Sequence, residues 1–463
     1  MTMLSRTNTI NSSLIIILGL VSLFEYVTNF FEDNVTLTNL YIFQVLLIFG
    51  LGVSETVKKV GLYHIFTLTC VTFFIFVLGG IAISPFFEVS IRVALSPDYE
   101  VFSEPTVQRA LLIYAVFFSI SFSYFIQQPL TTTNLGIWSN NASTEDSDYR
   151  NRLYGVGRNI MIGMLPFAFY YNYLFLQNDL RTSAFIEGGI AAPLYLRLTH
   201  LLFVIGFYCV VASVPKRRNF IFCFIIYLLT MIPIVLGGER GDFVVPIIFF
   251  VWYNYKFYGN KINILKLIGL AIAVMLFSYF ISFARRNETM TEGSILTLLF
   301  GFLAESATSL KLLCFYIVYH DHIMAHTYPF FLDSLIGGML PAAGQSLETL
   351  QIRSSIGHQL VYEINPNYYL AGHSMGTSFI TEAYEFGIIG VIISAFVFIK
   401  VILFFEKYVE KSRIGKYFLF YMFTIIILSP RGALLPGIYD LLKYGIIGGG
   451  ILMLFNLKLI NKK

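Results

Sequence analysis

The chain has 463 residues, of which 57% are hydrophobic and only 13% charged, and its formal net charge is +4. Soluble chains are typically about 25% charged, so this composition excludes an ordinary soluble protein and indicates a membrane protein. The small net charge gives no argument for nucleic acid as a partner. The four cysteines lie in apolar runs without metal-ligand or redox spacing, and we expect them to be buried structural residues.

Apolar runs recur along the whole chain, and each is long enough to cross a bilayer, which takes about 20 residues. They predict an all-α polytopic membrane protein with about twelve transmembrane helices. The predicted helix cores are 13–31, 39–55, 61–84, 108–128, 159–177, 194–214, 219–236, 242–257, 264–283, 377–404, 415–428 and 440–457. No cleavage site follows the first run, so it is not expected to be a cleaved signal. No repeat or linker separates a second domain, and residues 1–463 are predicted to form a single integral membrane domain.

The charges between these helices predict the topology, because Lys and Arg gather in cytoplasmic loops. Basic residues occur in every second connection between the predicted helices. They include Lys58 and Lys59, the run from Lys216 to Arg218, and further residues near 150–158, 256–266 and 407–416. The pattern predicts that both termini are cytoplasmic and that the one large loop, 284–376, is extracytoplasmic. Within that loop, residues 295–319 are apolar but carry Glu305 and Lys311. We expect a helix partly embedded in the membrane there; the alternative, an extra span, would break the alternation of charge.

Arginines also occur on the predicted extracytoplasmic side, where the orientation rule disfavours them. They are Arg240 in GGERGDF, Arg285, Arg286, Arg353, and Arg431 in SPRGALLPG. A positive charge near the membrane usually has a partner or a ligand, and the arginine fork matches phosphate oxygens. For each arginine the alternative is an ion pair with a nearby acid or a headgroup contact. Together they predict a site for a lipid-linked phosphate or diphosphate.

The extracytoplasmic segments also supply groups for acid–base chemistry. His320, His322, His326, His358 and His373 lie there, with Glu348, Glu363, Glu382 and Glu385. Imidazole and carboxylate are the usual groups that take a proton from a sugar hydroxyl. The HDHxxxH run at 320–326 lacks the spacing of a known metal motif, so we expect a polar turn there and no metal or other cofactor.

The stretch GHSMG, residues 372–376, matches the G-x-S-x-G nucleophile elbow of serine hydrolases. That elbow needs a strand, a sharp turn and a helix in an α/β sheet, and no parallel-strand pattern occurs in this chain. The alternative is a glycine turn that leads into the helix at 377–404, capped by Thr377 or Ser378. Glu382 would then face a polar cavity, stay protonated or form a structural ion pair with an outer arginine, because a carboxylate facing lipid is costly.

The order of these features resembles the Wzy-type O-antigen and capsule polymerases of bacteria. The resemblance covers the layout of nearly the whole chain, and its specific part is GTSFITEAYEFGIIG at 376–390, with weaker support from GERGDF and SPRG. It implies a membrane glycosyltransferase of C-type (GT-C-like) architecture. Such an enzyme joins undecaprenyl-diphosphate-linked repeat units at the outer face of the inner membrane, without nucleotide sugar or required metal.

The resemblance carries over to only some of the candidate residues. Arg240 and Arg431 match positions where these enzymes place arginines for the diphosphate, and Glu382 falls in the SFITE element. His358 and His373 match no motif and rest on their chemistry alone.

The expected reaction brings two lipid-linked glycans into one cavity, in which arginines hold the donor diphosphate. Glu382, His373 or His358 deprotonates the acceptor, and the anomeric carbon inverts. Membrane lipid is an expected partner, and a chain-length regulator is a candidate partner that the sequence does not name. The alternatives are an O-antigen ligase on the same scaffold and a flippase, which would need charges along a central path between the helices. The sugars, and whether the product is O-antigen or capsule, stay open.

Overall fold

The structure is a computed structural model of the chain. It describes residues 2–83, 102–129, 144–177, 193–236, 241–261, 295–324, 328–340 and 345–454, with a few single residues between 262 and 294. Every regular element in these residues is a helix, and they contain no strand. The all-helical fold expected from the composition is therefore confirmed.

The first half of the chain forms long helices. They are α1 (Thr2–Val27), α2 (Val35–Val60), α3 (Ile65–Phe73), the π-helix η1 (Phe74–Leu78), α4 (Gly79–Ile83), α6 (Glu104–Gln127), α7 (Thr144–Gln177), α9 (Leu194–Ser213), α10 (Arg217–Leu236) and α11 (Gly241–Tyr258). The second half mixes long and short helices. They are α13 (Ile295–Ser306), α14 (Thr308–Tyr319), α15 (Phe330–Ile336), η4 (Gly337–Met339), α16 (Leu347–Ile352), α17 (Ile356–Ile364), α18 (Pro366–Leu370), α19 (Phe379–Tyr384), α20 (Gly387–Lys411), α21 (Arg413–Tyr417), α22 (Leu419–Leu428), η5 (Ser429–Arg431) and α23 (Ile438–Leu454).

Helix α2 shows how local sequence sets the ends of a long helix. Asn34 has an extended backbone, and its side chain accepts a hydrogen bond from the Thr36 amide at 2.9 Å, which satisfies one of the free amides of the first turn. Gly61 follows the last residue with φ 89°, a conformation that glycine adopts without a Cβ penalty. Lys58 and Lys59 lie in the last turn, where positive charge is favourable.

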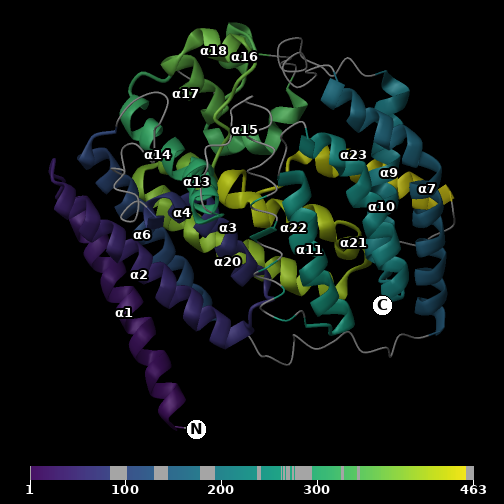
Figure 1. Ribbon diagram of the computed structural model, residues 1–463, viewed down its shortest axis with the longest axis horizontal. Helices are drawn as coiled ribbons and strands as arrows, with labels where there is room; N and C mark the ends of the chain where they lie inside the picture. The colour runs from purple at the N-terminus through teal and green to yellow at the C-terminus, as the bar shows by residue number, and fades with distance from the viewer. Residues whose placement is uncertain are drawn as a thin grey trace.

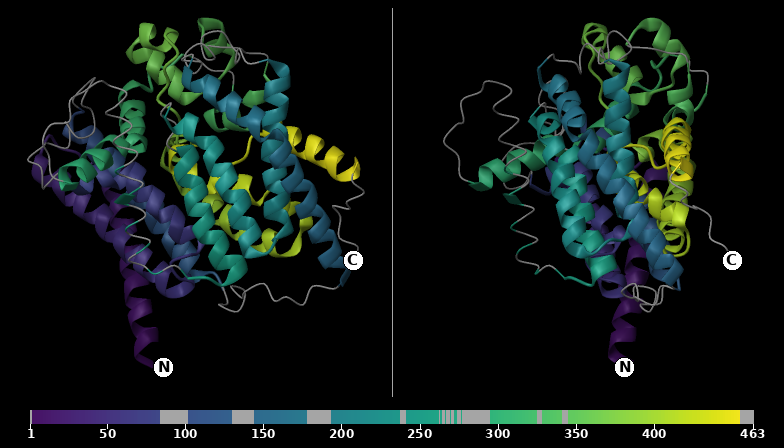
Figure 2. Two further views of the ribbon diagram at one scale, coloured as in Figure 1. Left: turned by 45° about the vertical axis from the view of Figure 1, so that its right-hand side comes forward. Right: turned by 90° about the vertical axis from the view of Figure 1, so that its right-hand side faces the viewer.

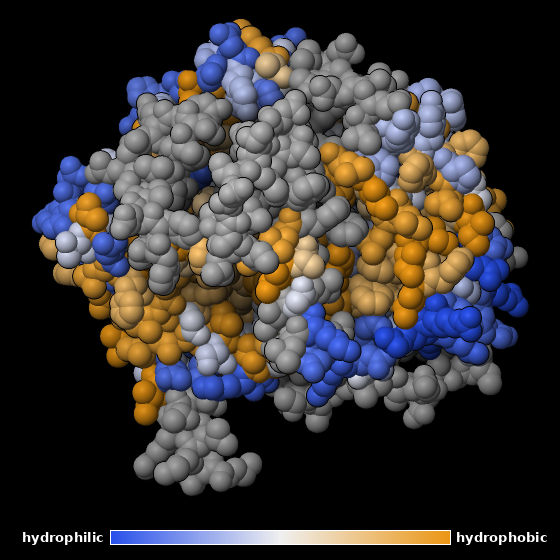
Figure 3. Space-filling model, in the orientation of Figure 1, coloured by the Kyte–Doolittle hydropathy of each residue, from blue (hydrophilic) through white to orange (hydrophobic). Residues whose placement is uncertain are grey.

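A band of apolar side chains crosses one face of the molecule at its middle. Figure 3 shows hydrophobic residues in a band across one face, with hydrophilic residues above and below it. Eight helical segments among the described residues are long and apolar enough to cross a membrane: Ile10–Val27, Val35–Val60, Ile65–Ile83, Glu104–Gln127, Leu194–Ser213, Arg217–Leu236, Leu299–Tyr319 and Gly387–Lys407. A multi-pass membrane protein is confirmed, whereas the expected number of about twelve spans is not. The expected helix at 264–283 falls almost wholly outside the described residues.

The segment 295–319 has the length and composition of a span, although we expected it to be only partly embedded. Its helix is interrupted at Ala307, where the backbone takes φ −69° and ψ 44°, so that α13 and α14 are separate helices of 12 residues each. Figure 2 shows them running in different directions. A helix of this length extends about 18 Å, less than the hydrocarbon thickness of about 30 Å. Partial embedding therefore stays a prediction.

The short helices α15 to α18 lie together at one end of the molecule, opposite to the N terminus (Figures 1 and 2). We call this the loop end. At the other end of the molecule, segments that the sequence predicts to be cytoplasmic contact each other. Arg150 Nη2 donates to the Val214 carbonyl at 2.9 Å, and Arg217 Nε donates to Asn254 Oδ1 at 3.0 Å.

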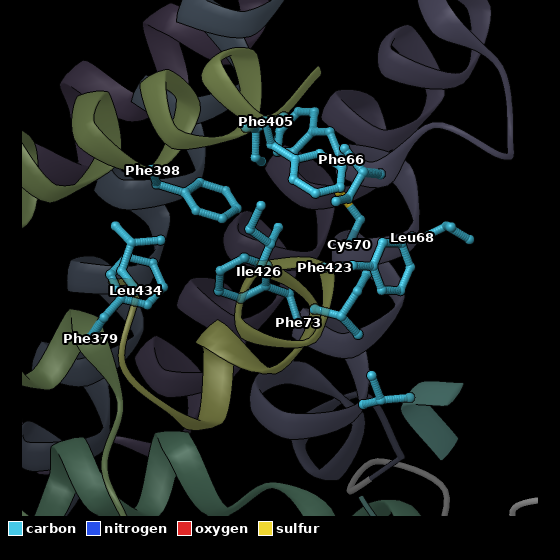
Figure 4. Close-up of a cluster of buried hydrophobic side chains, with 14 of the residues drawn as sticks. Phe66, Leu68, Cys70, Phe73, Phe379, Phe398, Phe405, Phe423, Ile426 and Leu434 are labelled. Atoms are coloured by element: carbon cyan, nitrogen blue, oxygen red, sulfur yellow. The ribbon is translucent and has the colours of Figure 1, made fainter. Parts of the chain in front are cut away.

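An aromatic core ties the loop end to the spanning helices (Figure 4). Phe379 of α19 stacks on Phe398 of α20 with ring centroids 5.6 Å apart, and Phe73 of α3 meets Phe398 edge-on, also at 5.6 Å. Lipid tails are as apolar as these rings, so close packing rather than escape from water holds such helices together. Each aromatic pair contributes about 1 kcal/mol beyond its buried area. Phe379 therefore anchors the short helix that carries Glu382.

The expected single helix at 377–404 is wrong in one respect. Residues Glu385 and Phe386 form a turn, so α19 ends at Tyr384 and α20 begins at Gly387. Gly387 takes φ 64°, which breaks the regular helical path. The break makes α19 a separate short helix, which packs on α15 of the loop end through the hydrogen bond between Ser334 and Glu382.

Candidate functional site

The stretch GHSMG forms an irregular turn between α18 and α19. Gly372 and Gly376 take φ values of 91° and 78°, and the Gly376 amide donates to Ser374 Oγ at 3.1 Å. The turn packs on α17 so closely that a Cβ on Gly357 would lie 1.8 Å from the Gly376 carbonyl oxygen. Helix α18 precedes the turn, not a strand. The geometry is that of the glycine turn and lacks the strand–turn–helix that a nucleophile elbow requires.

Glu382 of α19 is the most buried carboxyl group of the loop end, with a relative exposure of 3%. Its Oε1 accepts hydrogen bonds from Ser334 Oγ at 2.7 Å and from Thr377 Oγ1 at 2.5 Å. No Lys, Arg or His in the described part of the chain lies within 4 Å of this carboxylate. Burial raises the pKa of Glu382 to about 7, although the two hydrogen bonds oppose the shift. A carboxyl group poised near neutral pH is suited to general acid–base work.

Helix α15 supplies the hydroxyl partner and a second acid beside it. Asp333 pairs with Arg353 through two hydrogen bonds, Nε to Oδ1 at 2.7 Å and Nη2 to Oδ2 at 3.0 Å. This pairing raises the pKa of the Arg353 guanidinium. Gly337 lies under the guanidinium, since a Cβ there would come within 2.5 Å of Nη2. The Asp333–Arg353 pair therefore holds α15, and with it Ser334, against Glu382.

Two further contacts position α19. Glu385 Oε2 accepts a hydrogen bond from the Phe330 amide at the start of α15, at 2.8 Å. The hydroxyl groups of Tyr384 and Tyr26 of α1 lie 2.8 Å apart and share a hydrogen bond. Ser378 occupies the expected cap position without a side-chain hydrogen bond to the helix. The other expected cap, Thr377, instead donates its hydroxyl to Glu382.

Arg431 lies next to the start of α19. The carbonyl of its neighbour Gly432 accepts a hydrogen bond from the Phe379 amide at 3.0 Å. The Arg431 side chain is exposed, and its guanidinium lies over the Phe76 ring, 5.6 Å from the centroid. The structure therefore places the segment that carries Arg431 in contact with α19, the short helix that carries Glu382. Arg240, Arg285 and Arg286 lie outside the described residues, and their role stays a prediction.

The two histidine candidates make contacts of their own, and neither hydrogen-bonds to Glu382. His358 of α17 is packed near Tyr369, with ring centroids 5.8 Å apart, and burial lowers its pKa to about 4. It is therefore neutral at pH 7. The ring of His373 is exposed and stacks on Tyr368 at 3.9 Å. Of the three acid–base candidates, Glu382 is the one with hydroxyl partners and a shifted pKa near neutrality.

Arg353 was a candidate for the diphosphate, but the structure gives its fork to Asp333. This is the alternative in which the arginine pairs with a nearby acid, and the Arg353 side chain is still 28% exposed. Asp333 and Ser334 were not among the candidates. They lie in PFFLDSLIGGM, and an acid and a hydroxyl inside an apolar run of the large loop were the signal that could have revealed them.

No cluster of three His, Cys, Asp or Glu side chains that could hold a metal ion occurs among the described residues. In the HDHxxxH run, His320 Nε2 lies 3.2 Å from Asp321 Oδ1 on the surface, and His326 is outside the described residues.

These observations define a multi-pass helical membrane protein with a buried, hydroxyl-bound carboxyl group on a short helix and an exposed arginine in the segment that contacts the start of that helix. The family described as O-antigen polysaccharide polymerase Wzy matches residues 10–463. The chain therefore belongs to the Wzy family of O-antigen polysaccharide polymerases. No curated protein and no solved structure matches it. Membership supports a transferase role on lipid-linked oligosaccharide repeat units.

Proposed function

We propose that this protein polymerises undecaprenyl-diphosphate-linked repeat units at the outer face of the bacterial inner membrane, by inverting, metal-independent glycosyl transfer. The observation that carries the proposal is the environment of Glu382. It is buried, its side-chain hydrogen-bond partners among the described residues are hydroxyl groups, and burial raises its pKa to about 7. A carboxylate that served only structure at this depth would be expected to have a cationic partner.

The reaction needs a base for the acceptor and a stabilised leaving group. Both hydrogen bonds described for Glu382 go to Oε1, which leaves Oε2 to take the proton of the acceptor hydroxyl. The acceptor oxygen bonds to the anomeric carbon of the donor, and the bond from that carbon to the diphosphate oxygen breaks. The electron pair leaves with the diphosphate, and the configuration inverts.

The leaving diphosphate is assigned to the arginines. Arg431 lies beside the start of α19, and Arg240, Arg285 and Arg286 are proposed to complete the site. In a site shielded from water, fixed positive groups stabilise the charge that develops on the departing diphosphate. Arg353 is assigned a positioning role through Asp333 and Ser334, because its fork is already engaged.

The orientation is part of the proposal: both termini are cytoplasmic and the loop end is extracytoplasmic. The distribution of Lys and Arg supports it. It is also supported by the contacts of Arg150 and Arg217, which join predicted cytoplasmic joints at the end away from α15–α18.

Deletion of the gene tests the function against the ligase and flippase alternatives. A polymerase mutant retains a single repeat unit on its lipid core. A ligase mutant carries none, and a flippase mutant accumulates lipid-linked units in the cytoplasm. A ladder of products made by purified protein from the lipid-linked repeat unit alone would establish polymerisation, and its absence under these conditions would contradict the proposal.

A further inference from the structure

A cavity of about 280 Å³ lies between α1, α6 and α20, away from the loop end site. Ile16, Leu20 and Leu23 of α1 and Phe396 of α20 form its apolar walls. Ile16, Leu20 and Phe396 are 39%, 62% and 41% exposed, so the cavity is a groove at the lipid-facing surface. All three helices contain candidate membrane spans.

One wall of this groove is polar. Ser119, Ser123 and Gln127 follow each other at four-residue spacing and line the groove from one face of α6. The hydroxyl groups of Ser119 and Ser123 are buried and have no hydrogen-bond partner among the described residues. Ser119 is only 3% exposed. Buried hydroxyl groups without a partner are costly in an apolar environment, so this wall requires a ligand with acceptor atoms.

A lysine lies beside the polar wall. Lys400 belongs to the span Gly387–Lys407, yet its side chain is exposed. Its Nζ lies 5.4 Å from the ring centroid of Tyr124, which lines the groove, and Tyr124 also contacts Phe396 at 5.0 Å. No carboxylate in the described part of the chain lies within 4 Å of Lys400. A cation within a span is expected to have an anionic partner.

We propose that this groove binds one anionic phospholipid. The phosphate lies at Lys400, which can extend its side chain to the headgroup level. Ester oxygens accept hydrogen bonds from Ser123 and Gln127, and one acyl chain runs along Ile16, Leu20 and Leu23. Lys400 and Gln127 lie toward the same end of the groove, because Lys400 Nζ lies 5.4 Å from the Tyr124 ring and Gln127 follows Tyr124 by about one turn of α6. The bound lipid therefore belongs to the leaflet away from the loop end.

The observations favour a phospholipid over a second copy of the chain or another membrane helix. An apolar helix in the groove would leave the Ser123 hydroxyl and the Lys400 ammonium without partners. A phospholipid supplies an anion, ester acceptors and a hydrocarbon chain. The groove offers a partner to each of them in the same order: the lysine, the polar wall and the apolar wall of α1.

Native mass spectrometry of the purified full chain in neutral detergent tests this binding. Phosphatidylglycerol and phosphatidylcholine with identical acyl chains are titrated separately. We expect one phosphatidylglycerol to be retained in preference to phosphatidylcholine. Lys400→Gln should weaken phosphatidylglycerol binding about fivefold, the effect of one lysine at an anionic lipid surface. Lys261→Gln removes a charge from an exposed lysine after α11 and should leave binding unchanged.

Two more variants keep the test decisive if Lys400→Gln lowers the yield. Lys400→Arg keeps the charge and should retain the lipid, whereas Ser123→Leu fills the groove and should lose it. Equal retention of the two lipids, or unchanged phosphatidylglycerol binding in both Lys400→Gln and Ser123→Leu, would overturn the proposal. A lipid-free dimer that Ser123→Leu dissociates would also overturn it, by showing that a second copy covers the groove.

Discussion

Two carboxyl groups near opposite ends of α20 have different surroundings. Glu406, near the C-terminal end, has Lys256 Nζ at 3.2 Å and His64 Nε2 at 3.7 Å, and its side chain is 12% exposed. Glu382, just before α20, is bound by the hydroxyl groups of Ser334 and Thr377 and by no cation among the described residues. Glu406 has the ammonium group of Lys256 beside it, whereas burial disfavours the charged form of Glu382 and no cation among the described residues offsets that cost.

The difference separates a structural carboxylate from a reactive one. Glu406 joins α20 to α11 and to the start of α3, so its charge is part of the packing of the spanning helices. Glu382 can keep its hydrogen bonds without a charge, because a neutral acid or amide oxygen also accepts them, although more weakly than a carboxylate. Its replacement should therefore affect proton transfer before it affects folding.

Glu382→Gln is the strongest test of this contrast. Gln keeps the shape and the acceptor oxygen but cannot take a proton, so we expect polymerisation to fall at least about 100-fold, the usual contribution of a general base. Expression and the apparent melting temperature in detergent should stay near those of the wild type. The product ladder made by purified protein measures the first effect. If this variant is stable and fully active, the base lies elsewhere, and His373 becomes the next candidate.

Arg431→Ala should have the next largest effect on activity. Loss of a group that stabilises the leaving diphosphate lowers the rate about 100-fold, and Arg431→Lys should recover little of it, since an ammonium lacks the planar fork. Arg353→Ala is the matched comparison, because that guanidinium is engaged by Asp333 and its loss should lower stability as well. Full activity of Arg431→Ala would assign this arginine to local contacts only.

The pH dependence should show opposite trends for rate and stability. The pKa of Glu382 is raised from its ordinary 4.5 to about 7, so the folded protein holds a proton that the unfolded chain releases. This contribution to stability is full below pH 4.5 and is lost as the pH rises through 7. Polymerisation should rise over the same range, because the carboxylate is the active form. Melting temperatures and rates of the wild type and of Glu382→Gln at pH 5 to 8 measure both trends. A wild-type profile that coincides with that of the variant would contradict the assignment.

Glu406→Ala should reverse the pattern seen at Glu382. The variant removes the carboxylate that lies 3.2 Å from the buried Lys256 Nζ and should lower stability by about 3 kcal/mol. The activity of the protein that remains folded should be nearly normal, since this site lies at the other end of α20. Thermal unfolding in detergent, with activity normalised to folded protein, checks both expectations. An intact melting temperature would show that the pair at Glu406 does not stabilise the helix ends.

Part of this contrast could be predicted from the sequence. The apolar runs predicted an all-helical, multi-pass membrane protein, and a lone acid after a glycine turn made Glu382 a candidate. The partners of that acid could not be predicted, because Ser334 is 48 residues away and reaches Glu382 only through the packing of α15 on α19. The break at Gly387 was missed, because an apolar run does not reveal which glycine takes a positive φ. The pairing of Arg353 with Asp333 is likewise a tertiary contact between two short helices.

Ser374→Ala should have the smallest effect, although its motif looks most like a catalytic one. Ser374 Oγ accepts one hydrogen bond from the Gly376 amide within an exposed turn. Its loss should therefore change the folding equilibrium constant by no more than about twofold, and the polymerisation rate by a similar factor. Gly376→Ala is the control within the same turn. Its φ of 78° strains any residue with a Cβ, by about 1 kcal/mol, while nothing lies within 4 Å of the added atom. A product ladder for each variant, normalised to expression, makes the comparison. If Ser374→Ala folds normally and is inactive, the hydroxyl acts as a nucleophile, and the assignment of the base to Glu382 must be abandoned.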